Sequence, residues 1–387
     1  MFLFFILTYN HRKGNIYNMN KDVVKLLSIS DIHLGHNINK TDLIIKNLDK
    51  FFTKHSKLFK ELDIICIVGD LFDRLLISSS EEHINIINWL IRLVTFCKLN
   101  NIKLRILEGT PSHDWKQARI LTTFIEELNI DVDYKYIETL YIEEMNDLGI
   151  SILYIPDEYK NDANDTYLEV KKLLVDKKIS QVDIAYIHGQ FDYQAINGHK
   201  SIKQHNSNNY LSIVKHWISV GHIHTSSINS RIIAQGSFDR LRHSEEEEKG
   251  CYYLTISDIQ DDTLQFLENK NAMLFKTINL EDKTLEEVLL ELDNEIPKLP
   301  IDSNVRIIVN NIDFVTSNIN LANRYSNVNI KIEKKIIKEE VIEEEIEYET
   351  FNITKDNIIE LVIDELNSKS YTTDEISNVI KELKEVK

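Results

Sequence analysis

The stretch IICIVGDLFDR, residues 64–74, carries a fold signal and a chemical signal side by side. Ile64 to Val68 is a short unbroken apolar run, which is typical of a strand buried on both faces. Gly69 and Asp70 follow at once, so a carboxylate stands at the carboxyl end of that strand. The glycine lets the backbone of neighbouring segments approach closely. We therefore expect this segment to lie in a sheet and to deliver Asp70 to the edge where ligands bind.

Similar apolar runs alternate with stretches of helical spacing along the chain. This alternation predicts an α/β layered fold. The later strands follow one another closely, which favours mixed pairing in the sheets. The expected strands are 25–29, 64–68, 103–107, 151–155, 183–187, 217–220, 231–234 and 251–256, and the expected helices are 41–54, 81–97 and 115–128.

The chain of 387 residues is long enough for about two or three domains. A main domain is expected at 19–270, followed by a small α+β capping domain at 271–335. Residues 336–352 are highly charged and predict a connector, and 353–387 contain two short amphipathic helical patterns, the second opening with a capping box. Residues 1–18 are expected to be a dispensable extension, because Met19 precedes a clear strand and resembles a second start.

Composition excludes several classes of protein. Gly 10 and Pro 4 are too few for a collagen-like or flexible low-complexity chain. The net charge of -17 argues against nucleic-acid binding by bulk attraction, although a basic groove or a bound divalent metal overcomes it locally. Three cysteines without a CxxC pattern indicate a reducing, cytoplasmic setting. The apolar residues 1–9 are too short to span a bilayer and lack a signal-peptide pattern.

Five clusters rich in His and Asp each follow a strand candidate. Because ligands bind at the carboxyl ends of strands in α/β sheets, the five clusters are expected to converge on one crevice. Neutral imidazoles together with carboxylates suit Mn, Fe or Zn. A carboxylate such as Asp70 can bridge two cations, and two cations held close together can clamp a phosphoryl group. The clusters are 30–33 (SDIH), 69–74 (GDLFDR), 109–114 (GTPSHD), 188–189 (HG) and 221–224 (GHIH).

In this order the clusters resemble the motifs of the calcineurin-like metallophosphoesterase superfamily. Within it the chain is most similar to the SbcD-type DNA repair exonucleases and their phage relatives, over residues 24 to about 256. The closer resemblance rests on ISDIHLG at 29–35, VGDLFDR at 68–74, GTPSHDW at 109–115 and GSFDRLRHSEEEEKG at 236–250. It implies a metallophosphoesterase layered α/β sandwich with a two-metal centre, most simply two Mn2+ ions.

The resemblance also implies roles for individual residues. His113 would orient the scissile phosphate and protonate the leaving oxygen, and Asp73 would fix the tautomer of His113. Asp70 would bridge the two metals. The implied ligands of the first metal are Asp31, His33, Asp70 and His224, and those of the second are Asp70, His188 and His222.

One cluster departs from the pattern of the superfamily. Gly109-Thr-Pro-Ser-His113-Asp114 stands where Gly-Asn-His-Asp or Glu is usual, so the Asn ligand of the second metal is missing. Ser112 occupies the position before the His, and we expect it to be a weak ligand through its hydroxyl or a water. The departure concerns the affinity of the second site.

These observations predict a Mn-dependent nuclease that hydrolyses DNA phosphodiester bonds, with DNA as its partner. The resemblance implies further partners, an SbcC-type ATPase bound through residues 353–387 and a second copy of the chain in a homodimer. Two alternatives stay open: a phosphatase or small-molecule phosphodiesterase of the same superfamily, and a non-catalytic scaffold on the same fold. No membrane partner is expected.

Overall fold

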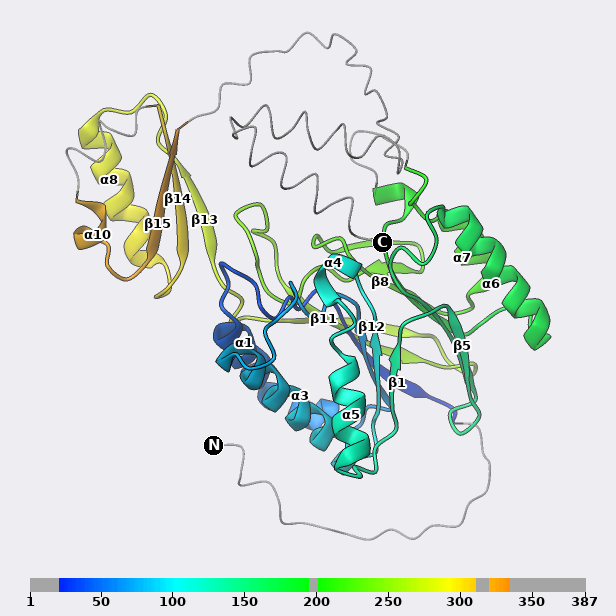
Figure 1. The fold of residues 1–387 in the computed structure, drawn as a ribbon. Coiled ribbons are helices and arrows are strands. Elements are labelled where there is room, and N and C mark those ends of the chain that lie inside the picture. Colours follow the sequence, from blue (N-terminus) through cyan, green and yellow to red (C-terminus); the bar gives the residue numbers. More distant parts are fainter. Residues whose placement is uncertain (1–20, 195–200, 311–319, 335–387) are drawn as a thin grey trace, which may run out of the picture. The chain divides into compact units, whose positions relative to one another are not determined.

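A computed structural model describes residues 21–194, 201–310 and 320–334 of the chain (Figure 1). The predicted extension 1–18, connector 336–352 and helical pair 353–387 lie outside the described residues. Within those residues the strands form two six-stranded mixed sheets and one three-stranded sheet. The chain therefore has an α/β fold.

The first sheet has the strand order β12-β11-β1-β2-β3-β4. The neighbours from β1 to β4 are parallel, whereas β11 pairs antiparallel with both β1 and β12. This sheet contains the strand predicted from residues 64–68. Its strands are β1 (Val24–Ile29), β2 (Ile64–Val68), β3 (Lys103–Leu107), β4 (Tyr134–Ile137), β11 (Gly250–Ile256) and β12 (Thr263–Glu268).

The second sheet has the order β5-β6-β7-β8-β10-β9. Its central pairs β6 with β7 and β7 with β8 are parallel. The outer pairs β5 with β6 and β9 with β10 are antiparallel, as the close spacing of strands in the sequence predicts. Its strands are β5 (Tyr141–Met145), β6 (Ile150–Ile155), β7 (Ile184–His188), β8 (Ile218–Gly221), β9 (Ser227–Asn229) and β10 (Ile232–Ala234).

Helices cover the outer face of each sheet, so the main part of the chain has four layers (Figure 1). Helices α1, α3 and α5 pack on the first sheet, and α6 and α7 pack on the second. The helices in order are α1 (Thr41–Lys54), α2 (Ser56–Phe59), α3 (Glu81–Asn100), α4 (Pro111–Asp114), α5 (Arg119–Glu127), α6 (Ala163–Lys177) and α7 (Ser207–Ile213), with a 3-10 turn at Asp192–Gln194.

The two sheets pack face to face, which explains the unbroken apolar strands. In β2, Ile65 and Ile67 belong to the core beneath the helices, whereas Ile64, Cys66 and Val68 belong to the core between the sheets. Because successive side chains point to opposite faces, a strand covered on both faces must be apolar throughout. At roughly 1.5 to 3 kcal/mol for each fully buried aliphatic side chain, these central strands contribute strongly to folding.

One predicted helix begins in the wrong place. We expected a helix from Trp115 to Leu128, but the chain forms the short α4 and then α5, which begins at Arg119. Trp115 and Lys116 between them have positive φ angles of 49° and 54°, and a helix cannot continue through left-handed residues. The strands β4, β5, β9 and β12 and the helices α2, α6 and α7 were not predicted.

The third sheet has the order β13-β14-β15 and its own apolar cluster. Both pairings are parallel, and α8 lies between β13 and β14 in sequence. This arrangement alternates strand and helix, so it differs from the α+β arrangement that we expected at 271–335. Its elements are β13 (Phe275–Asn279), α8 (Leu285–Glu295), a 3-10 turn (Ile296–Lys298), β14 (Asn304–Val309), α10 (Leu321–Arg324) and β15 (Asn329–Lys334). Among the described helices of the whole chain, none is both long and apolar enough to cross a membrane.

Candidate metal centre

The parallel strands of the two main sheets deliver their carboxyl ends to one place. His188, the last residue of β7, donates its Nδ1 proton to the carbonyl oxygen of Val68, the last residue of β2, over 2.8 Å. This bond joins one sheet to the other at the predicted site. Three overlapping sets of ligand atoms, each within 4.8 Å of one another, form around it: Asp31, His33 and His224; His33, Asp70 and His113; Asp70, His188 and His222. The first group means the residues predicted for the first metal (Asp31, His33, Asp70 and His224), and the second group means those predicted for the second (Asp70, His188 and His222).

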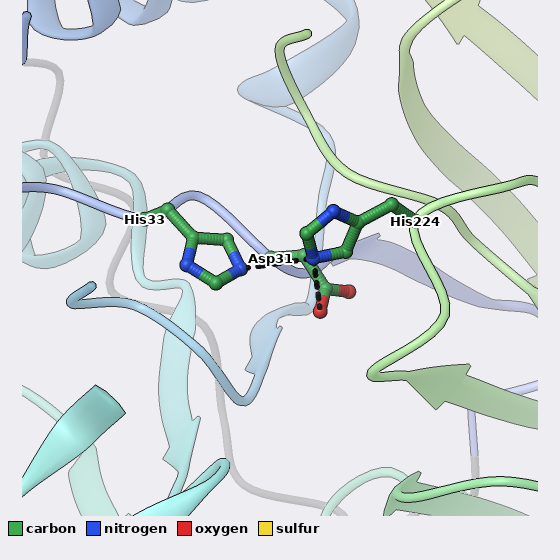
Figure 2. Close-up of side chains that lie close together, drawn as sticks. All are labelled: Asp31, His33 and His224. Atoms are coloured by element: carbon green, nitrogen blue, oxygen red, sulfur yellow. Dashed lines mark hydrogen bonds and ion pairs between the residues drawn. The ribbon is translucent and has the colours of Figure 1, made fainter. Parts of the chain in front are cut away.

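In the first group, two imidazoles face each other beside a carboxylate. The Nε2 atoms of His33 and His224 lie 3.1 Å apart, and Nε2 of His224 lies 3.9 Å from Oδ1 of Asp31 (Figure 2). Nε2 of His33 also lies 3.7 Å from Oδ2 of Asp70. Asp31, His33 and Asp70 are buried. These are the four residues that the sequence predicts for the first metal.

Acceptors behind the rings fix the direction of the histidine lone pairs. Nδ1 of His33 lies 3.0 Å from Oδ1 of Asp73, and Nδ1 of His224 lies 2.8 Å from Oε1 of Glu245. Carboxylates only accept hydrogen bonds at neutral pH, so in the neutral rings the protons sit on Nδ1 and the lone pairs on Nε2. A second acceptor of this kind is the usual partner of a metal-binding histidine.

Glu245 is itself held in an ordered network. It is buried, accepts from the backbone N–H of Leu241 at 3.0 Å and lies 3.4 Å from Nζ of the buried Lys249. Burial opposes ionisation, but His224 and Lys249 outweigh it and lower the pKa of Glu245 to about 2. Glu245 therefore stays ionised behind His224. The stretch 236–250 thus supplies the carboxylate that orients this histidine.

In the second group, Asp70 lies close to two further histidines. Its Oδ1 lies 3.3 Å from Nε2 of His188, and the rings of His188 and His222 meet edge to face with centroids 5.5 Å apart. Burial raises the pKa of Asp70, but the neighbouring His188, His113 and His33 outweigh it and hold that pKa well below its ordinary value. Asp70 thus lies 3.7 Å from His33 and 3.3 Å from His188, which is the place expected of a carboxylate between the two groups.

Two glycines make this close approach possible. An added Cβ at Gly69 would overlap the ring of His188, and one at Gly109 would overlap the backbone and carboxylate of Asp70. Gly69 also has a positive φ of 79°, a backbone conformation that residues with a side chain rarely adopt. The Gly-Asp step of residues 69–70 is therefore required by packing within the site.

His113 lies beside the two groups and is partly exposed. Its Nδ1 lies 3.0 Å from Oδ2 of Asp70, and its ring centroid lies 4.9 Å from that of His33. The side chain is 36% exposed, whereas those of His33 and His188 are 2% and 0% exposed. The hydrogen bond to Asp70 raises the pKa of His113. The ring is thus at the rim of the site, where it is open to solvent.

The prediction that Asp73 fixes the tautomer of His113 is wrong, because Asp73 contacts a different histidine. Asp73 contacts Nδ1 of His33, and Asp70 contacts Nδ1 of His113. Asp73 follows β2 by five residues. Its backbone N–H donates to the carbonyl of Leu34 at 3.0 Å, and this bond holds Asp73 beside the first group. Asp73 is therefore placed to orient a candidate ligand.

The prediction for Ser112 also differs from the structure. Ser112 is exposed on α4, and its carbonyl oxygen accepts a hydrogen bond from the indole N–H of Trp115 at 2.7 Å. Thr110, two residues earlier, points into the second group instead: its Oγ1 lies 3.3 Å from Nδ1 of His222 and 3.5 Å from Nε2 of His188. The departure from the superfamily pattern places Thr110, not Ser112, beside these residues.

Asp157 was not predicted from the sequence. It follows β6, the neighbour of β7, and its Oδ2 lies 3.2 Å from Oγ1 of Thr110 and 3.5 Å from Nδ1 of His222. The available signal was its place, two residues after a buried strand, in the stretch Ile-Pro-Asp. Because no histidine stands next to it in the sequence, this position alone was too weak an indication to identify Asp157 as a site residue.

The donor set fits a divalent cation. Ligands about 2.1 Å from a cation lie about 3.0 to 3.5 Å from one another, and the separations in both groups are close to this range. Buried carboxylates together with nitrogen lone pairs suit a borderline divalent metal. These His and Asp groups could therefore hold a metal ion.

No protein-family model and no curated protein matches this chain. Among solved structures, one similar chain has a TM-score of 0.37 and 14% identity, covering 63% of this chain and 99% of that one. A likeness of this size carries no argument about family or function. The function must therefore be inferred from the site itself.

Proposed function

We propose that this chain is a metallophosphoesterase, and specifically a metal-dependent DNA nuclease of the SbcD type. The observation that carries the proposal is the single buried carboxylate of Asp70, shared between two groups of imidazole and carboxylate ligands. The four-layer sandwich and the ordered motifs of the sequence support the same superfamily. The two ions, most simply Mn2+, are part of this proposal.

Two bound divalent cations would polarise the phosphoryl group and lower the pKa of an attacking water. The residues of the chain do the rest. Asp70 holds the two groups at a fixed separation, while Asp73 and Glu245 keep the Nε2 atoms of His33 and His224 directed inward. In hydrolysis, the attacking water gives up a proton to solvent as its oxygen bonds to phosphorus, and the bond from phosphorus to the leaving oxygen breaks. His113, at the rim, donates the proton that the leaving oxygen takes up.

Two alternatives have less support. A phosphatase or small-molecule phosphodiesterase would use the same centre, but it would not need the additional unit built from β13, α8, β14 and β15. A non-catalytic scaffold on this fold would not need to retain His113 together with buried ligand groups. The nuclease is therefore the preferred function.

The partners and location are proposed from the sequence. DNA is the substrate, and an SbcC-type ATPase is the proposed partner of residues 353–387. A homodimer and a cytoplasmic location complete the proposal.

The test is hydrolysis by the purified full chain with and without Mn2+. End-labelled duplex DNA and bis-p-nitrophenyl phosphate report diester hydrolysis, and p-nitrophenyl phosphate reports monoester hydrolysis. We expect Mn-dependent cleavage of DNA and the diester but not of the monoester. Preferential monoester hydrolysis would favour the phosphatase, and no hydrolysis of any of them would favour the scaffold.

A further inference from the structure

We propose that Thr110 and Asp157 complete the second cation site, with the hydroxyl and a carboxylate together replacing the amide ligand that the chain lacks. This inference rests on the proposed function, since it assigns the second metal of that centre. It concerns which side chains of this chain hold the ion, and what kind of cation they prefer.

The first argument is the position of the Thr110 hydroxyl. Oγ1 lies 3.2 Å from Oδ2 of Asp70, 3.2 Å from Oδ2 of Asp157 and 3.3 Å from Nδ1 of His222. A hydroxyl carries one proton, so it can donate to one of the two carboxylates and presents a lone pair to the other. Oxygen lone pairs gathered at such separations are stabilised by a cation among them.

The second argument is how Asp157 is held. The backbone N–H of Glu158 donates to Oδ1 of Asp157 at 2.9 Å, so this oxygen is engaged and Oδ2 is left to face Thr110 and His222. The side chain is 11% exposed. Its ion-pair contact is with the imidazole of His222, a proposed ligand of the same site, and a divalent ion there would balance the charge of this largely buried carboxylate.

The third argument is charge. The second group as predicted contains one carboxylate, Asp70, which it shares with the first group, and two imidazoles. Asp157 adds a negative charge that belongs to the second site alone. The enlarged set has three oxygen-bearing side chains, Asp70, Thr110 and Asp157, with His188 and His222. Oxygen-rich sets favour Mn2+ or Mg2+ over softer ions.

The test is Mn2+ binding to the full chain, measured by isothermal titration calorimetry and by electron paramagnetic resonance. Asp157→Asn keeps the shape and removes the charge, and Thr110→Val keeps the shape and removes the hydroxyl. Glu158→Gln is the matched control, because it removes the same charge from an exposed side chain one residue away. Circular dichroism checks the folding of each variant.

We expect the wild type and Glu158→Gln to bind two equivalents and to show the spectrum of two magnetically coupled ions. Asp157→Asn and Thr110→Val should bind the first equivalent normally and the second at least about tenfold more weakly, with the spectrum of an isolated ion. If one variant does not fold, the other decides. Two equivalents bound with wild-type affinity by a folded variant would overturn the assignment, as would loss of the second equivalent in Ser112→Ala instead.

This readout is independent of hydrolysis. If the variants bind metal normally while the wild type cleaves DNA, the ligand assignment fails and the proposed function stands. If the wild type binds two ions as assigned but cleaves no phosphoester, the proposed function fails and the assignment stands.

Discussion

The Nε2 atoms of His33 and His224 face each other at 3.1 Å, although 191 residues separate the two histidines in the sequence (Figure 2). Each ring has its Nδ1 turned toward a carboxylate, Asp73 behind His33 and Glu245 behind His224. In the neutral rings two lone pairs therefore point at one another, and a cation held by His33, His224 and Asp31 would stabilise this arrangement.

The contact between Asp73 and His33 predicts an indirect effect on metal binding. Asp73→Ala removes the acceptor that orients the ring, so Mn2+ affinity at the first site should fall roughly 10- to 100-fold. Asp73→Asn should retain most of the affinity, because its amide oxygen still accepts from Nδ1. Calorimetric titration distinguishes the two variants. Equal loss in both would mean that the charge of Asp73, and not its orientation of the ring, matters.

A change at Asp70 is expected to affect metal binding at both groups, because its two carboxylate oxygens lie beside different histidines, His33 and His188. Asp70→Asn should weaken both equivalents of Mn2+ and abolish Mn-dependent hydrolysis, whereas His33→Ala should weaken mainly the first equivalent. Metal analysis after gel filtration gives the stoichiometry. A variant at Asp70 with normal stoichiometry and turnover would contradict the two-metal centre.

A variant at His113 is expected to affect turnover without affecting metal binding. His113→Ala should keep both equivalents of Mn2+ and lower kcat by on the order of 10² to 10⁴, because a positioned acid contributes about that much. Metal content and kcat are measured on the same preparation. Loss of metal together with activity would identify His113 as a ligand, in line with its 3.0 Å contact with Asp70.

The buried pair of Arg105 and Glu143 predicts a pH-dependent stability. Arg105 Nε lies 2.8 Å from Oε2 of Glu143, and Lys135 Nζ lies 2.7 Å from Oε1. Burial raises the pKa of Glu143, but these two cations outweigh it and lower that pKa below its ordinary value. A lowered carboxyl pKa stabilises the fold above the unfolded pKa of about 4.3, and this stabilisation is lost as the pH falls through the folded pKa.

Glu143→Gln should therefore cost about 3 kcal/mol of unfolding free energy at pH 7, because it removes the buried carboxylate beside Arg105 and leaves that guanidinium paired with the half-exposed Asp133. The difference from wild type should shrink as the pH falls below about 4. Urea unfolding at several pH values measures both. The control is Glu144→Gln, which breaks an exposed pair with Lys177 and should change stability by less than about 1 kcal/mol. A difference that grows on acidification would contradict the lowered pKa.

The sequence pattern of residues 353–387 predicts a partner contact that is separable from catalysis. Two short amphipathic helices are marginal alone and gain stability by burying their apolar faces. Deleting these residues should leave Mn-dependent hydrolysis of small diesters unchanged and abolish co-purification with the cognate SbcC-type ATPase. Wild-type binding of the ATPase by the shortened chain would show that the contact lies elsewhere.

Much of the site could be predicted because its residues stand next to strong local signals. Asp31, His33, Asp70, His188, His222 and His224 each end a strand or follow one within four residues. Parallel strands carry such residues to one edge within each sheet, and the contact of His188 with Val68 joins the edges of the two sheets. The structure brings all six together with His113.

The α/β class and the residues that gather at the site could therefore be predicted from the sequence, because apolar runs and their adjacent polar residues are local properties of the chain. The tertiary structure decided the contacts between them: Asp73 with His33, Glu245 with His224, and Thr110 and Asp157 beside His222. These contacts depend on how the two sheets pack and on where loops such as Ile155 to Asp157 turn. The packing of the two sheets follows from how side chains fit together across the interface between them. The course of each loop follows from its backbone geometry, and no local pattern of residues specifies either the packing or the loop.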